Sequence, residues 1–97
     1  MIRFAKMSTE DPFRKLQEQL EKEPSWPLVY MFKFIIPADN QKLALIESLF
    51  STEAVLTQQA SEKGNYISIT VKEVMLDAPS VISVYSKASK IPGVIAL

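Results

Sequence analysis

The sequence SEKGNYISITVKEV occupies residues 61–74 and contains a turn followed by a strand. Gly64 and Asn65 tolerate the positive φ angles that a tight hairpin turn requires. After the turn, branched apolar and polar residues alternate, as they do in a strand with one buried face. Residues 54–60, directly before the turn, are also suited to a strand, so we expect a β-hairpin over residues 54–74.

A strand and a helix are expected on each side of this hairpin. Residues 28–36 are rich in branched and aromatic side chains, which predicts a central strand covered on both faces. Asp39 or Asn40 is expected to cap a helix before the hairpin, and Asp77 a helix after it. A short final strand is predicted at residues 94–97. The expected buried faces of the helices are Leu43, Ile46, Leu49 and Phe50 in the first and Val81, Val84, Tyr85 and Ala88 in the second.

The N-terminal segment is interpreted as an addition to this unit, so the expected division is residues 1–27 and residues 28–97. Residues 1–7 are expected to be a flexible lead-in, and Ser8 or Thr9 to cap an extra helix. Three apolar residues of that helix recur at helical spacing and form one stripe. They are Phe13, Leu16 and Leu20.

Two strand–helix–strand units joined by a hairpin predict one particular sheet. With right-handed crossovers in both units, the result is an α+β, ferredoxin-like βαββαβ sandwich. It has a four-stranded antiparallel sheet with two helices on one face, plus the extra N-terminal helix. Residues 28–36 and 66–74 would form the central strands. The more polar residues 54–60 and the short strand at 94–97 would form the edges.

The composition excludes most kinds of catalytic site. The 97 residues include no cysteine and no histidine, which excludes disulfides, thiolate zinc sites and catalytic pairs or triads built on either residue. No cofactor or metal is expected. Eleven basic and eleven acidic residues balance, which argues against nucleic acid or an anionic membrane as a partner. Because no apolar run approaches the roughly 20 residues of a membrane span, the expected location is the cytoplasm.

Five stretches of the sequence occur in a recognisable order. Phe32-Lys33-Phe34 lies in the first expected strand, residues 61–66 form the turn, and residues 67–71 alternate after it. Tyr85 lies in the last helix, and residues 94–97 form a hydrophobic strand. In these features the chain resembles the YbeD-like family of small bacterial proteins, a family of unknown function. The resemblance implies an ACT-like, ferredoxin-type fold and no particular activity.

At the end of the first strand the chain departs from that family. Pro37 stands where many members have glycine. ACT-type domains often place ligand-contacting backbone near this turn, where glycine permits close approach and proline removes a donor. The resemblance therefore does not carry an ACT-type ligand site to Pro37.

The hairpin turn is the first candidate site. One interpretation is structural, because lysine–glycine turns are common in hairpins. The other is a contact with an anion or a protein partner, for which the turn supplies a positive charge, amide donors and an exposed ring. The residues of this candidate site are Ser61, Lys63, Gly64, Asn65 and Tyr66.

The second candidate site is the face of the sheet that the two helices leave open. Of the four positions of the first expected strand on this face, three are apolar, which indicates that something covers them. The cover is either the N-terminal helix of the same chain or a second subunit, and both remain open. The expected residues of this interface are Val29, Met31, Lys33, Ile35, Ser68, Thr70 and Lys72, with Tyr66 beside them.

The favoured functional hypothesis is a non-enzymatic, ACT-like regulatory or interaction module that acts as a homo-oligomer or with a protein partner. The second is a domain that senses a small molecule, such as an amino acid or another metabolite. RNA-binding domains share the element order, but Lys63-Gly64 is not followed by the aromatic spacing they need. An enzyme with an arginine-lined phosphate site is disfavoured, because the only arginines, Arg3 and Arg14, both precede the first expected strand.

Overall fold

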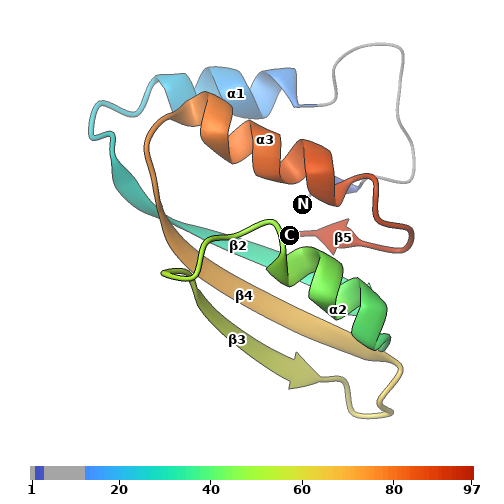
Figure 1. The fold of residues 1–97 in the computed structure, drawn as a ribbon. Helices are drawn as coiled ribbons and strands as arrows, with labels where there is room; N and C mark the ends of the chain where they lie inside the picture. The colour runs from blue at the N-terminus through green and yellow to red at the C-terminus, as the bar shows by residue number, and fades with distance from the viewer. Residues whose placement is uncertain (1, 4–12) are drawn as a thin grey trace.

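The computed structural model describes residues 2–3 and 13–97, which form an α+β structure with one antiparallel sheet and three helices (Figure 1). The elements in chain order are β1 (Ile2–Arg3), α1 (Arg14–Glu21), β2 (Leu28–Pro37), α2 (Asn40–Glu47), β3 (Val55–Ala60), β4 (Tyr66–Met75), α3 (Ala78–Ala88) and β5 (Ile95–Ala96).

The sheet has five strands in the order β1-β5-β2-β4-β3, and every neighbouring pair is antiparallel. The prediction of β2 and β4 as the central pair is confirmed, since they pair over ten positions, from Leu28 with Met75 to Pro37 with Tyr66. The prediction that the last strand is an edge is wrong, because Ile2–Arg3 pairs with its outer side. The prediction of a flexible lead-in is also wrong for Ile2 and Arg3, which form β1. A two-residue strand leaves no periodicity from which to predict it.

The helices lie on one face of the sheet (Figure 1). Alternate residues of β2 and β4 are buried on that face and belong to the core. Phe32 and Phe34 are fully buried there, opposite Val71 and Ile69. The core therefore lies between the sheet and the helices, as the alternation in residues 66–74 predicted.

Both helices that flank the hairpin begin at the predicted aspartates. The backbone amide of Gln41 donates to Asp39 Oδ1 at 2.8 Å, and the amide of Ser80 donates to Asp77 Oδ1 at 2.9 Å. All four residues predicted for the buried face of α3 are buried. On α2, Ile46 is fully buried and Leu43 is partly buried. The other two predicted residues, Leu49 and Phe50, follow the end of the helix and are also partly buried against the core.

Helix α1 packs against α3 in the helix layer (Figure 1). Phe13, directly before α1, is buried, and its ring stacks on that of Tyr85 with centroids 6.3 Å apart. The predicted caps, Ser8 and Thr9, lie outside the described residues. Because α1 lies on the helix side of the sheet, one of the two alternatives left open for the cover of the open face, the N-terminal helix of the same chain, is wrong. The expected cover of β2 on both faces is also absent from the described residues, since Val29 is 64% exposed.

Candidate interaction surface

The open face is the side of the sheet that points away from the helices. Alternation along each strand and the pairing register place all seven predicted interface residues on it, with Tyr66 beside them. The register adds residues of the outer strands, because directly paired residues share a face. The open face consists of Val29, Met31, Lys33 and Ile35 on β2, Tyr66, Ser68, Thr70, Lys72 and Val74 on β4, Val55, Thr57 and Gln59 on β3, and Ile95 on β5. Leu97 joins it, since its amide donates to the Lys33 carbonyl at 2.9 Å, opposite that residue.

Large apolar side chains gather on the open face. Of the eight that are exposed in the described part of the chain, six lie here, and Leu45 and Leu76 lie elsewhere. Val29 and Val74 form a directly paired couple, 64% and 58% exposed. Contiguous patches of exposed apolar side chains often mark binding surfaces.

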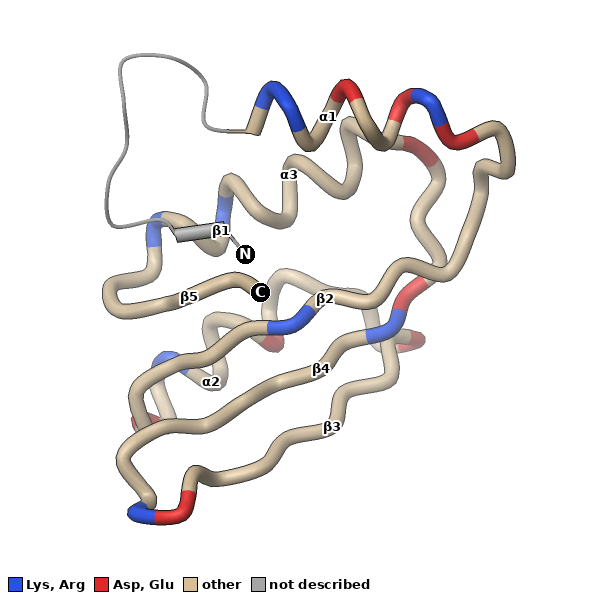
Figure 2. Tube along the Cα trace, turned by 180° about the vertical axis from the view of Figure 1, so that it is seen from behind, with Lys and Arg blue, Asp and Glu red and all other residues tan. Residues whose placement is uncertain are grey.

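Two lysines lie on the open face, one on β2 and one on β4, where Figure 2 shows a basic residue on each strand. Lys33 pairs with Thr70 and Lys72 with Met31, so the lysines are diagonal neighbours on one face. Within residues 13–97 neither of them forms an ion pair, and the ion pair found there joins Arg14 to Glu18 on α1. The open face therefore carries uncompensated positive charge between apolar side chains.

A hollow of about 240 Å³ separates the two lysines. Two lysines and two threonines line it together with the apolar residues Met31 and Val55. The lining residues are Met31, Lys33, Val55, Thr57, Thr70 and Lys72. Ammonium and hydroxyl groups all donate hydrogen bonds, so this hollow is suited to an acceptor such as a carboxylate.

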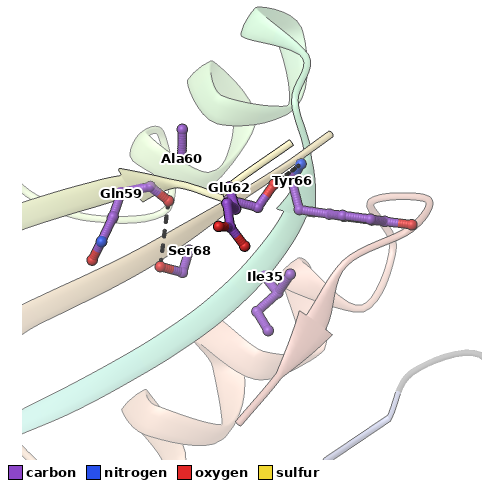
Figure 3. Close-up of a pocket in the computed structure, with 7 residues that line it drawn as sticks. Ile35, Gln59, Ala60, Glu62, Tyr66 and Ser68 are labelled. Atoms are coloured by element: carbon purple, nitrogen blue, oxygen red, sulfur yellow. Dashed lines mark hydrogen bonds between the residues drawn. The ribbon is translucent and has the colours of Figure 1, made fainter. Parts of the chain in front are cut away.

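A larger pocket of about 440 Å³ lies at the hairpin end of the open face (Figure 3). It brings Ser61 and Tyr66 of the first candidate site together with Ile35 and Ser68 of the second. Three further lining residues, Gln59, Ala60 and Glu62, were not predicted as site residues. Gln59 pairs directly with Ser68, so its place in the pocket follows from the strand register, which the sequence did not indicate.

The hydrogen bonds of the hairpin turn account for most of its predicted site residues. The Ser61 amide donates to the Tyr66 carbonyl at 2.8 Å, and the Tyr66 amide donates to Ser61 Oγ at 3.0 Å. Gly64 has a φ of +75°, and the Asn65 carbonyl accepts from the Ala38 amide at 2.9 Å. Lys63 lies outside the lining of the 440 Å³ pocket. The structural interpretation of the turn thus has direct support, and Tyr66, 51% exposed, links the turn to the open face.

Tyr85 and Asp77, whose pKa values are shifted, lie away from the open face. Burial, with a hydrogen bond to Tyr30, raises the pKa of Tyr85 in the core. Hydrogen bonds from Ser80 lower the pKa of Asp77 at the start of α3. Among the described residues no cluster of three or more potential metal ligands occurs. No helix in that part of the chain has the length and apolar character needed to cross a membrane.

Comparison with known proteins gives one match. A family model with the description "Protein of unknown function (DUF493)" matches residues 21–97. This match confirms the resemblance to the YbeD-like family, and it begins several residues before the expected boundary at residue 28. No curated protein and no solved structure matches the chain.

Proposed function

The chain belongs to the DUF493 family, whose model spans well over half of its length, and from this premise we propose that it is a non-enzymatic interaction module that binds a protein through its open face. We further propose that its fold is of the ACT-like, ferredoxin-type kind. The order β5-β2-β4-β3 supports this, since it places the first and third strands of the βαββαβ unit at the centre.

One observation carries the proposal: an apolar surface without cover in the described chain. Met31 is 46% exposed, although it lies between Tyr30 and Phe32 at the middle of the central strand. In a protein that acts alone, such positions normally carry polar side chains, because exposed apolar patches promote association. A protein partner or a second copy would remove this area from water.

The pocket beside Tyr66 favours small-molecule sensing as a second candidate function. Its volume of about 440 Å³ falls within the ordinary range for ligand pockets. Apart from Ile35, which is half-buried, its lining residues are exposed, and the polar groups of Ser61 and Ser68 already bond within the hairpin. We therefore rank sensing below protein binding.

Affinity purification from native lysate, followed by mass spectrometry, tests the main proposal. The comparison includes a Met31→Glu variant and a matched Leu45→Glu variant on α2, since these side chains are 46% and 48% exposed. We expect Met31→Glu to lose co-purifying proteins and Leu45→Glu to retain them. Retention of the same proteins by both variants, or no co-purifying protein with the wild type, would contradict the proposal.

A further inference from the structure

We infer that the open face accepts an acidic amphipathic helix of a protein partner, with the apolar side of the helix along β2 and a carboxylate between Lys33 and Lys72. This inference rests on the proposed function and names the chemistry of the partner. Three features of the open face support it: the shape of its apolar stripe, its two lysines and the pairing of its central strands.

The apolar stripe has the length of a short helix. Val29, Met31 and Ile35 lie along the open side of β2, with Lys33 between Met31 and Ile35, and Ile95 and Leu97 lie beside them on the β5 side. Six residue steps at about 3.3 Å each give about 20 Å, the length of a helix of roughly 13 residues. The stripe thus matches the apolar side of three to four helical turns.

The pairing of β2 and β4 determines how a partner can bind. β4 is paired with β2 on one side and, over residues 67–72, with β3 on the other, and β2 is paired with β4 throughout and bonded to residues 95–97 at Lys33, Phe34 and Ile35. The sheet beneath the two lysines therefore offers no free backbone groups. A segment that covers it must satisfy its own amides and carbonyls, because buried unpaired backbone groups are costly. A helix does this within itself.

The lysines determine the charge of the partner. An apolar segment laid over Lys33 and Lys72 would remove two ammonium groups from water without compensation, which is unfavourable. A carboxylate in the 240 Å³ hollow would lie among Lys33, Lys72, Thr57 and Thr70, whose ammonium and hydroxyl groups can donate hydrogen bonds to it. Charge-assisted hydrogen bonds of this kind are among the stronger polar contacts in proteins.

The same charges argue against a second copy of the chain on this face. In a symmetric face-to-face dimer, the centre of one open face meets the centre of the other. Lys33 and Lys72 of both copies would then approach one another, and like charges at an interface disfavour binding. Single-stranded RNA fits less well, because Tyr66 is the only aromatic side chain among the described residues of the face and bases stack on several.

A displayed library of random peptides of about 16 residues, one turn longer than the stripe, tests the inference. The library is selected in parallel on the wild-type chain and on a Lys33→Glu/Lys72→Glu double variant. We expect wild-type selection to enrich aspartate and glutamate beside apolar residues at helical spacing, and selection on the double variant to enrich lysine and arginine. An enriched acidic peptide should bind at least about tenfold more weakly to the double variant and to Met31→Glu, and more weakly at high salt.

A Lys15→Glu/Lys22→Glu variant supplies the matched control, because both lysines are exposed and belong to the α1 region. It should retain wild-type affinity for the acidic peptide. Thermal melting checks that each variant is folded. A Lys33→Gln/Lys72→Gln variant, which should also weaken binding, replaces the charge reversal if the latter does not fold.

Several results would overturn the inference. These are enrichment of neutral or basic peptides by the wild type, no enrichment at all, binding that the double variant leaves unchanged, or tight binding of a labelled single-stranded RNA that requires the same two lysines. If any of these results occurs while Met31→Glu still loses proteins from lysate, the proposed function stands and only the chemistry of the partner is wrong.

Discussion

The hydroxyl groups of Tyr30 and Tyr85 lie 3.1 Å apart and connect the beginning of β2 to α3. Their rings meet edge to face, with centroids 6.3 Å apart, and the other side of Tyr85 stacks on Phe13. Tyr85 thus joins the sheet, α3 and the segment that leads into α1. Burial, with the hydrogen bond to Tyr30, raises the pKa of Tyr85, so its hydroxyl stays protonated at neutral pH.

Removal of either hydroxyl should destabilise the fold modestly. Tyr85→Phe is expected to lower the free energy of unfolding by about 1 kcal/mol, the usual net worth of one hydrogen bond. Tyr30→Phe should cost a similar amount, and the double variant less than the sum, because both changes delete the same bond. Urea denaturation of the four proteins measures this. Additive losses would show that the two hydroxyls do not interact.

The residues of β2 should divide sharply by face. Phe32→Ala is expected to lower the free energy of unfolding by about 3–5 kcal/mol, since it opens a cavity in the aromatic core. Met31→Ala, one residue earlier and on the open face, should change it by less than about 0.5 kcal/mol. Urea midpoints of the two variants test this contrast. A large loss from Met31→Ala would mean that the open face is covered in the protein itself.

The two glycines should respond differently to alanine. Both have positive φ angles, +75° at Gly64 and +83° at Gly93, so each substitution carries a backbone cost of about 1 kcal/mol. At Gly64 an added Cβ meets nothing, but at Gly93 it would lie 2.9 Å from Pro37 Cγ. Gly93→Ala should therefore destabilise the chain clearly more than Gly64→Ala, as measured by thermal melting. Equal effects would contradict the close approach of Gly93 to Pro37.

The cap of α3 should contribute to stability in a pH-dependent way. The hydroxyl and amide of Ser80 donate to Asp77 at 2.6 and 2.9 Å and hold the pKa of this carboxyl below its ordinary value of 3.8. Because the folded state has the lower pKa, the stabilisation is present above pH 3.8 and is lost as the pH falls through the folded value. The difference in urea midpoint between wild type and Asp77→Ala should therefore shrink below pH 3.8 and be smaller at pH 3 than at pH 7. A difference that stays constant with pH would exclude a charged cap.

The parts of the fold that depend on repeated local patterns were predictable from sequence. The alternation in residues 66–74 gave the correct buried face, and Asp39 and Asp77 were identified as caps because a carboxylate before a helix has a local physical role. The partner of Ile2–Arg3 was not predictable, since two residues carry no period and pairing depends on distant β5. The position of α1 also depends on a tertiary contact, that of Phe13 with Tyr85.

The candidate surface was predictable in part for the same reason. Alternation placed Met31, Lys33 and Lys72 on one face, and the structure confirms that arrangement. The sequence did not reveal that the face lies uncovered by α1, because the apolar stripe of that helix fits a sheet and another helix equally well. Nor did it indicate Glu62 and Gln59 beside the hairpin, whose proximity to Ile35 depends on the strand register.

The pairing of Ile2–Arg3 with β5 has a consequence for aggregation. It leaves two long unpaired stretches in the described sheet: the outer edge of β3, a six-residue strand without charge or proline, and residues 28–32 of β2, which β5 does not reach. Two chains that joined through β3 would still carry residues 28–32 without a neighbouring strand at each end of the joint sheet. Growth into a filament requires two usable edges on each chain. The described sheet meets this condition, so the short strands β1 and β5 do not by themselves limit strand pairing to two copies.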